Sequence, residues 1–438
     1  MKKMLFAWAL LLGCCVMAAE YKFELKSSKP WKIKVNEEIT FSARLLSRKD
    51  AKSPFVPLKG AAVSCQLVGD GMKTVYKKAV SSDGFVTLSG KLDRPGWIYA
   101  AFYMLDEKGK NVTAKNSAGK TAIVHGGIGA LVEPEKLKVG KEEPKDFDAF
   151  WKSQRERLNK VPLTAKLTEV KNHKFKGFKL YDVQVSCAGD MPMSGYLTVP
   201  EGAKAKTLAA YVTYQGAGVS GSWINVAKNA ITMNINAHGI PNGHPKDYYV
   251  NLSRTTLKTY WHKNKNDRDK IYFNGMYLRV MRSLDFIKSR PEWDGKTLIV
   301  SGSSQGGGQA IAAAALDPQV TLCVAAVAAL SDHSGSLADR QPGWPRFYDV
   351  RGKGKADPKV IEAAAYYDNV FFARRIKCET WLTTGLFDRT CSPAGVYVVY
   401  NNLAAAKKDL DVFPEGGHGG APAKKGHLRI KAVLDGKK

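Results

Sequence analysis

Closely spaced cysteines are missing from this chain after its first fifteen residues. Of its seven cysteines, Cys14 and Cys15 lie in an apolar N-terminal stretch. The others are odd in number and have no short spacing: Cys65, Cys187, Cys323, Cys378 and Cys391. Neither a metal-ligand pattern nor a disulfide framework follows from such spacing. We expect buried free thiols, with pairing of any two left open if the protein works in an oxidising compartment.

Acidic residues are scarce as well. The chain has 40 Asp and Glu against 67 Lys and Arg, which gives a formal net charge of +27 at pH 7. A positive field of this size favours anionic partners such as uronic-acid polysaccharides or cell-surface polymers, although a solvated surface with no partner has the same composition. No nucleic-acid-binding motif accompanies the charge, so we exclude nucleic acid as a partner.

A long apolar run occurs only near the start of the chain, from Met4 to about Ala18, directly after Met1-Lys2-Lys3. Its length, its basic flank and the small residues at its end predict a signal peptide over residues 1–19 and no membrane span. We therefore expect an exported protein, periplasmic or secreted. Leu11-Leu12-Gly13-Cys14 also resembles a bacterial lipobox, which leaves a lipid anchor at Cys14 as the alternative.

The length of 438 residues exceeds that of one compact core, so two domains are expected. From residue 20 to about 130, apolar residues alternate with period two, as in Trp31, Ile33 and Val35, and turn signals separate the runs. This pattern predicts an all-β, immunoglobulin-like sandwich domain. Residues 131–145 carry two prolines and alternating charges without periodicity, which predicts a linker.

Strands and helices alternate from residue 146 to residue 438. The segment from Asp146 to Leu158 predicts an amphipathic helix that opens this domain. Later helices are expected at 275–289, after the strand ending at 300, and at 392–406, and strands at 180–187, 193–199, 208–214, 230–236, 298–300, 320–329, 380–384 and 410–413. This order predicts an α/β fold with a largely parallel central sheet and helices on both faces.

A glycine-rich segment, Ser-Gly-Ser-Ser-Gln-Gly-Gly-Gly-Gln-Ala, occupies residues 301–310 between an apolar strand and a helix-forming run. Strand, sharp turn and helix around Gly302-x-Ser304-x-Gly306 are typical of a nucleophile elbow, which exposes a serine hydroxyl at the end of a strand. A glycine-rich loop with no catalytic role can have the same sequence. We predict that Ser304 is a nucleophile.

A serine nucleophile needs a histidine base and a carboxylate that orients the histidine, in the chain order serine, acid, histidine. His418 lies in a glycine-rich loop just past the apolar strand at 410–413, and it is the predicted base. Of the other histidines after Ser304, His427 fits a solvated helix surface and His333 comes too early in the chain.

The predicted acid is Asp388, which follows the apolar strand that begins at residue 380. Asp332 also ends a strand and is the competitor for that role. For either aspartate, a helix cap or an ion pair is the ordinary structural alternative.

An oxyanion hole needs two backbone amides. Gln305, which follows the nucleophile, is expected to supply one, and Ala217, in the loop after the strand at 208–214, the other. The same loop contains Gly216-x-Gly218-x-x-Gly221, which matches a dinucleotide fingerprint. The acidic residue expected about twenty positions further on is absent, so we predict no cofactor.

These motifs resemble the acetyl xylan esterase and cephalosporin-C deacetylase family, carbohydrate esterase family 7. The resemblance covers residue 144 to the C-terminus and rests on the Gly-x-Ser-Gln-Gly elbow, Tyr366-Tyr367-Asp368, Gly385-Leu386-x-Asp388 and Gly417-His418. It implies an α/β-hydrolase with Ser304, Asp388 and His418 as its triad, the Gln305 and Ala217 amides as its oxyanion hole, and no metal. It also implies an acetylated carbohydrate as substrate.

The chain departs from this family at three places. Cys391-Ser392-Pro393 stands where the family has a Pro-Pro-Ser-Thr stretch, Gly419 replaces a glutamate after the base, and Gln215-Gly216-Ala217 replaces His-Gly-Tyr. The last change removes an aromatic side chain from the acyl pocket, which puts acyl size in question. Compact members form ring-like hexamers, so a homo-oligomer is one expectation, although a leading sandwich would obstruct that ring.

The predicted function is therefore an exported serine esterase that removes acetyl groups from acetylated xylan, xylo-oligosaccharides or other acetylated sugars. Two alternatives remain. A serine peptidase can pair a β-rich leading domain with this fold, but no glutamate pair for a substrate amino terminus is evident. A non-catalytic glycan-binding protein would use the sandwich alone.

Overall fold

The computed structural model of the protein describes residues 20–115, 119–352 and 354–437. The predicted signal peptide, residues 1–19, and its alternative, the lipid anchor at Cys14, lie outside these ranges. Within them, no helix has both the length and the apolar character that crossing a bilayer requires.

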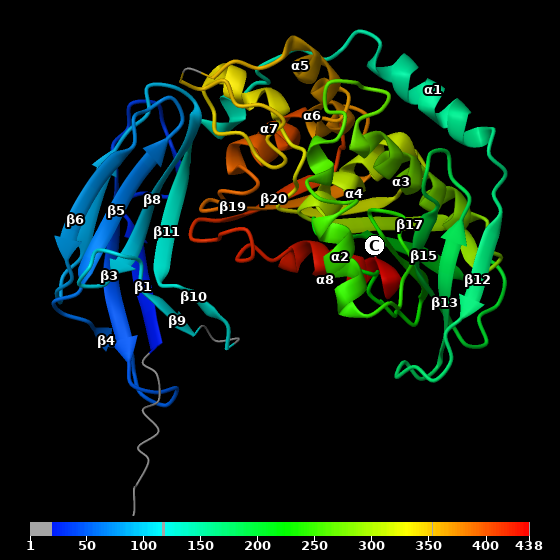
Figure 1. The fold of residues 1–438 in the computed structure, drawn as a ribbon, viewed down its shortest axis with the longest axis horizontal. Helices are drawn as coiled ribbons and strands as arrows, with labels where there is room; N and C mark the ends of the chain where they lie inside the picture. The colour runs from blue at the N-terminus through cyan, green and yellow to red at the C-terminus, as the bar shows by residue number, and fades with distance from the viewer. Residues whose placement is uncertain (1–19, 116–118, 353, 438) are drawn as a thin grey trace, which may run out of the picture.

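The N-terminal part consists of two sheets that face each other, drawn in blue to cyan in Figure 1. One sheet has the order β1-β3-β4, with β7 also paired to β3, and the other has the order β2-β11-β8-β5-β6. The strands are β1 (Glu20–Ser27), β2 (Lys32–Ile33), β3 (Ile39–Arg48), β4 (Val56–Pro57), β5 (Ala62–Gly69), β6 (Val75–Val80), β7 (Val86–Gly90), β8 (Gly96–Leu105), β9 (Thr113–Lys115), β10 (Thr121–Ile123) and β11 (His125–Val132). This is the predicted sandwich, and β9 and β10 form a small extra hairpin.

Strand β8 is buried on both faces, which explains its nearly continuous apolar sequence. Ile98, Ala100 and Phe102 belong to the sandwich core. The alternate residues Trp97 and Tyr99 belong to the core of the C-terminal part instead. Because successive side chains of a strand point to opposite faces, β8 joins the two parts of the molecule.

The segment predicted to be a linker is partly structured. Its first residues, Leu131 and Val132, are the end of β11, and a short helix, η1 (Pro134–Lys136), follows. Leu137 is buried in the same core as Trp97.

The C-terminal part is built on a nine-stranded sheet with the order β12-β13-β14-β16-β15-β17-β18-β19-β20. The first three strands are antiparallel, and the strands from β16 to β20 in that order run parallel to one another. Their bounds are β12 (Ala165–Glu169), β13 (Phe178–Val185), β14 (Met193–Pro200), β15 (Leu208–Tyr214), β16 (Ala230–Ile235), β17 (Trp293–Ser303), β18 (Leu322–Ala326), β19 (Glu379–Gly385) and β20 (Lys408–Phe413). Strand β18 is shorter than the predicted 320–329 because Val327 and Leu330 take positive φ angles.

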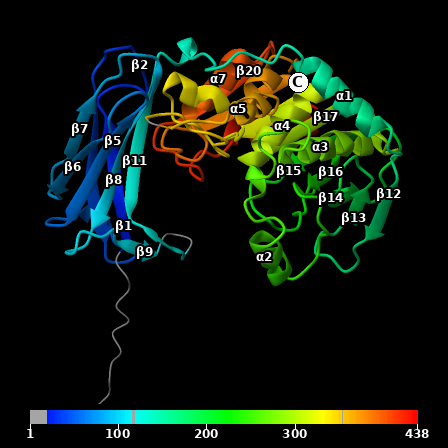
Figure 2. The same cartoon turned by 45° about the horizontal axis from the view of Figure 1, so that its top comes forward.

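Helices cover both faces of this sheet, as predicted (Figure 2). They are α1 (Phe147–Asn159), α2 (Lys246–Arg254), α3 (Tyr272–Lys288), α4 (Gln305–Leu316), α5 (Pro358–Ala365), α6 (Asn369–Ala373), α7 (Pro393–Asn402) and α8 (Lys424–Leu434), with short helices η2 (Tyr260–His262) and η3 (His333–Ala338). In β17, Val300 packs into the core that contains α3 and α4, whereas Ile299 packs into the smaller cluster that contains Ile430 of α8. The largely parallel sheet with helices on both faces is the predicted α/β-hydrolase fold.

Candidate active site

Ser304 lies at the sharp turn between β17 and α4. Its backbone has φ 59° and ψ −125°, a conformation that L-residues rarely adopt. The following helix points its N-terminus, the positive end of its dipole, toward this residue. The turn therefore exposes the Ser304 hydroxyl at the carboxyl end of a central strand, as the sequence pattern predicted.

Two glycines make this turn sterically feasible. A Cβ atom at Gly302 would lie 2.3 Å from the carbonyl carbon and oxygen of Gly306, and one at Gly306 would lie 2.1 Å from the carbonyl oxygen of Tyr214. Both distances are shorter than any real contact. The Gly-x-Ser-x-Gly spacing thus follows from the close approach of helix α4 to its own strand and to β15.

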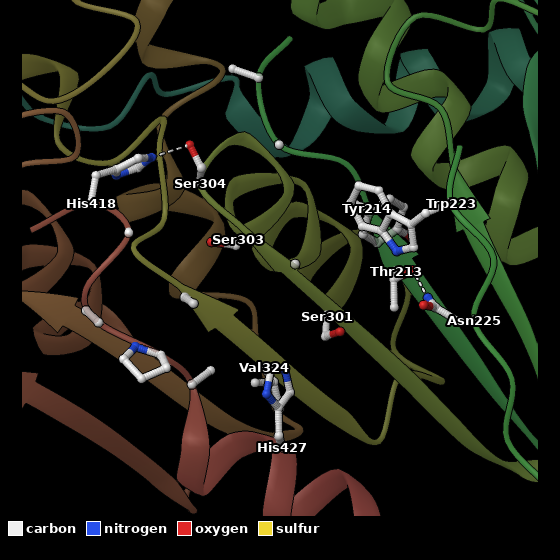
Figure 3. Close-up of a pocket in the computed structure, with 18 of the residues that line it drawn as sticks. Thr213, Tyr214, Trp223, Asn225, Ser301, Ser303, Ser304, Val324, His418 and His427 are labelled. Carbon is white, nitrogen blue, oxygen red and sulfur yellow. Dashed lines mark hydrogen bonds between the residues drawn. The ribbon is translucent and has the colours of Figure 1, made fainter. Parts of the chain in front are cut away.

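The structure brings the three predicted triad residues together. His418 Nε2 lies 3.0 Å from Ser304 Oγ (Figure 3). On its other side, His418 Nδ1 lies 2.8 Å from Asp388 Oδ2. The carboxylate accepts from Nδ1–H, which leaves the Nε2 lone pair free to accept the serine proton. Asp388 is fully buried and His418 is partly exposed.

Backbone amides hold the carboxylate in place. The second oxygen of Asp388 accepts from the amide N–H groups of Thr390 at 2.8 Å and Cys391 at 2.9 Å. Both oxygens are therefore occupied, which fixes the orientation of the carboxylate beside the histidine.

The two amides predicted for an oxyanion hole lie near Ser304. Gln305 begins α4, so its N–H has no partner within the helix, and Ala217 lines the same cavity as Ser304. Across the described ranges, neither amide donates to a protein acceptor. The loop before Ala217 is tied to α4, since Gln309 Nε2 donates to the carbonyl of Gln215 at 2.9 Å.

A histidine that the sequence analysis did not select, His238, supports the same loop. Its Nε2 donates to the carbonyl of Gly218 at 2.8 Å, and its Nδ1 accepts from Tyr272 Oη at 2.7 Å. Burial lowers the pKa of His238 to about 4. The imidazole is therefore neutral near pH 7. The signal available in the sequence was the pair of polar residues, Asn236 and His238, directly after the buried strand β16.

The residues considered as alternatives to Asp388 and His418 do not take part in the triad. Asp332 pairs with Arg340 at 2.6 Å in a buried salt bridge. His333 is buried against Phe347, and burial lowers its pKa to about 4. His427 is exposed on α8, although it lines the far side of the cavity that contains Ser304.

Two cavities meet at His418. The first, of about 550 Å³, runs from Ser304 and His418 down the sheet face to His427, past Thr213 and Trp223 (Figure 3). The segment between β15 and β16, which forms no helix, lines one side of it through Trp223 and Asn225. The second, of about 540 Å³, lies between the sandwich and the hydrolase part.

The segment directly after β15 also does not fit a dinucleotide-binding site, because it forms no helix. That fingerprint requires a helix whose N-terminus binds the pyrophosphate. Residues 215–229, which contain Gly216-x-Gly218-x-x-Gly221, have no helix.

One group of side chains has the ligand types of a metal site. Ligand atoms of Asp388, Cys391 and His418 all lie within 4.8 Å of one another. Burial raises the pKa of the Cys391 thiol far above its ordinary value, so the thiol stays protonated, whereas metals bind the thiolate. Asp388 is already saturated by His418 and two amides, so this trio does not fit a metal ion.

All five cysteines in the described ranges are free thiols, and Cys65, Cys323 and Cys391 are buried. This agrees with the expectation of free thiols.

Comparisons with known proteins point to one family. A family model described as acetyl xylan esterase (AXE1) matches residues 130–431. Acetyl esterase Axe7A from Xylanibacter ruminicola is 34% identical over 286 residues, which are 63% of this chain and 64% of that protein. The match thus spans less than two thirds of the length of this relative.

Two solved structures share the fold. The acetyl xylan esterase from Paenibacillus sp. R4 is 26% identical, with a TM-score of 0.58, and the match covers 70% of this chain and 99% of that one. Acetyl xylan esterase 1 from Thermoanaerobacterium sp. JW/SL YS485 is 24% identical, with a TM-score of 0.57, covering 69% and 97%. At its level of identity, the second bears on the fold alone.

Proposed function

This chain belongs to the acetyl xylan esterase family, whose model matches most of it, and we propose that it is a serine esterase that removes O-acetyl groups from acetylated carbohydrate, such as xylan or xylo-oligosaccharides. The observation that carries the proposal is the hydrogen-bonded chain from Ser304 through His418 to Asp388, beside two backbone amides that find no acceptor among the described residues. We include in the proposal that residues 1–19 direct export.

In the first half of the reaction, Ser304 Oγ attacks the acetyl carbonyl while its proton moves to His418 Nε2. The carbonyl oxygen becomes negative, and the amides of Gln305 and Ala217 donate to it. Asp388 keeps Nδ1 protonated and stabilises the imidazolium. His418 then gives its proton to the sugar oxygen, the bond from carbonyl carbon to that oxygen breaks, and the acetyl group remains on Ser304.

In the second half, a water molecule replaces the sugar. His418 takes a proton from the water, the hydroxide attacks the acetyl carbonyl, and the serine oxygen leaves with the proton from Nε2. Acetate is released and the free enzyme returns. In every proton transfer, His418 Nε2 is the donor or the acceptor.

The lining of the two cavities favours a sugar ester over a peptide. A peptidase that binds a free amino terminus needs a carboxylate near the scissile bond. Among the described residues, neither cavity has an Asp or Glu in its lining.

The test is acetate release by the wild type and by Ser304→Ala from acetylated xylan, acetylated xylo-oligosaccharides and a small aryl acetate. We expect release from all three by the wild type and a loss of at least about a thousandfold in kcat for the variant, because nothing else supplies the nucleophile. Ser253→Ala, at an exposed serine of α2, is the matched control and keeps full activity. Activity on the aryl ester alone would leave the nucleophile in place and exclude xylan as the substrate.

A further inference from the structure

The cavity between the two parts of the molecule includes the predicted base in its wall. His418 lines it together with Arg346 and Arg389 of the hydrolase part and with Tyr99 of β8 and His125 of β11. In Figure 1, β11 is the sandwich strand that faces the hydrolase part, beside the loop that follows β20. The sandwich therefore contributes side chains to a cavity that reaches the predicted base, His418.

Close contacts fix this wall relative to the triad. Trp97 Nε1 donates to the carbonyl of Leu386 at 2.8 Å, two residues before Asp388. The amide of Gly129 donates to the carbonyl of Pro414 at 2.9 Å, in the loop that leads to His418. A Cβ atom at Gly127 would lie 2.2 Å from the ring of Phe387, so β11 packs directly on the strand end that carries the acid.

Two guanidinium groups give the cavity a positively charged lining, and the charge of Asp349 offsets part of that of Arg346. Across the described residues, neither Arg346 nor Arg389 has a carboxylate oxygen within 4.0 Å, and no Asp or Glu lines the cavity. Arg389 donates to Tyr103 Oη at 2.7 Å and packs over the ring of Phe387, and Arg346 donates to the carbonyl of Arg389 at 2.5 Å. These bonds orient the guanidinium groups but leave most of their five N–H donors free.

The geometry of the reaction constrains where the sugar part of the substrate lies. The sugar oxygen must lie next to His418 Nε2 to receive its proton, and the acetyl oxygen must face the amides of Gln305 and Ala217. Ala217 lines only the first cavity, whereas His418 lines both. A sugar chain that extends past His418, away from Ala217, has the cavity between the two parts open to it.

We propose that this cavity binds the sugar part of the substrate and selects an acetylated glycan that carries a carboxylate, that is, a uronate-bearing chain. Arg346 and Arg389 bind the carboxylate, since a guanidinium matches its geometry with paired N–H donors, and the sandwich residues Tyr99 and His125 form the opposite wall. This inference rests on the proposed deacetylase function and gives the N-terminal sandwich a part in substrate selection.

The first test measures binding without catalysis. The Ser304→Ala protein is titrated by calorimetry with a xylo-oligosaccharide that bears one glucuronate branch and with the same oligosaccharide after reduction of its carboxyl group. We expect the acidic form to bind about tenfold more tightly, with a difference that shrinks in high salt. Arg346→Gln together with Arg389→Gln, made in the same background, abolishes the difference. Arg254→Gln, which removes one positive charge from the exposed end of α2 and is matched to Arg346→Gln alone, retains it.

The second test measures the ratio of kcat/KM for the acetylated acidic oligosaccharide to that for its carboxyl-reduced counterpart. Because both rates come from one protein, any general loss of activity cancels in the ratio. Arg346→Gln alone, on a loop separate from Asp388, is expected to lower the ratio severalfold. Equal binding of the two oligosaccharides by the Ser304→Ala protein, or equal loss of preference in Arg254→Gln, overturns the inference.

These outcomes separate the inference from the proposed function. Failure of the wild type to release acetate from either oligosaccharide contradicts the deacetylase function, whatever the binding result. Acetate release from both at equal kcat/KM supports that function and contradicts selection of a carboxylate.

Discussion

His238 illustrates how a residue outside the triad can be tied to the reacting centre. Both of its ring nitrogens are occupied in the neutral tautomer, one by the Gly218 carbonyl and one by Tyr272. Gly218 follows Ala217, whose amide is proposed to hold the oxyanion. The buried imidazole therefore positions that amide, and protonation of the ring would break the arrangement.

We expect this histidine to make stability depend on pH. Between pH 6.5 and about 4 the unfolded chain binds a proton at His238 while the folded protein does not, so the unfolding free energy falls as the pH falls, by about 3 kcal/mol in total. In His238→Gln, whose amide can donate to Gly218 and accept from Tyr272, the loss of stability between pH 7 and pH 4.5 should be smaller by about 2–3 kcal/mol. Urea unfolding at both pH values measures this difference.

Other buried groups do not obscure that comparison. Burial raises the pKa of Asp70, Asp332 and Asp368 to about 6, which lowers stability as the pH rises toward that value and so acts in the opposite direction. These aspartates are present in both proteins, so their contribution cancels. His244→Gln, at an exposed histidine, is the control, since it retains His238. Identical pH dependence in wild type and His238→Gln would contradict the assignment.

At the scale of elements, strand β11 of the sandwich packs against the end of β19, just before the predicted acid Asp388. Gly129 of β11 approaches Leu386 so closely that a Cβ atom would lie 2.2 Å from its carbonyl oxygen. Backbone atoms cannot rotate away as a side chain would. Any larger residue at this position must therefore move β11 or the segment that carries Asp388.

Gly129→Ala is expected to reduce both stability and activity. We expect a loss of about 1–3 kcal/mol in the free energy of unfolding, as for other overpacked sites. A fall in kcat on an aryl acetate should accompany it, because Asp388 lies two residues beyond Leu386. Urea unfolding and steady-state kinetics measure the two effects. Gly84→Ala, at an exposed turn of the sandwich where a Cβ atom meets only the Ser82 hydroxyl at 3.6 Å, is the control and should change neither.

At the scale of the whole molecule, one hydrophobic cluster crosses from the sandwich to the hydrolase part. Trp97 and Tyr99 of β8 belong to the same cluster as Leu386 and Phe387, and their own rings stack at 4.5 Å. An interface that shares a core in this way couples the two parts energetically. The sandwich is thus part of the folded unit rather than a tethered module.

Scanning calorimetry is expected to show one unfolding transition for the wild type. Trp97→Ala removes a side chain that is 1% exposed and leaves the Leu386 carbonyl without its donor. Loss of that packing, about 3–5 kcal/mol, should separate the transition into two. Trp223→Ala, at a tryptophan that is 47% exposed, should keep one transition. Two transitions in the wild type would show that the shared core does not couple the parts.

The sequence alone determined the features that depend on neighbouring residues along the chain. Alternation with period two predicted the sandwich, the order of strands and helices predicted the α/β sheet, and the glycines around Ser304 predicted the turn, since each of these follows from local backbone geometry. Asp388 and His418 were predicted to meet because each follows a strand of a parallel sheet and such strands end at the same edge, and the structure places His418 Nδ1 2.8 Å from Asp388 Oδ2.

Only the tertiary structure decided what depends on contacts between distant segments. The support of Gly218 by His238, the cavity that joins Tyr99 and His125 to His418, and the placement of Arg346 beside Arg389 all bring together residues far apart in sequence. The apolar run of β8 looked like an ordinary sandwich strand, because periodicity does not reveal what covers its second face. Which groups share a site is a property of packing, and packing appears only once the chain has folded.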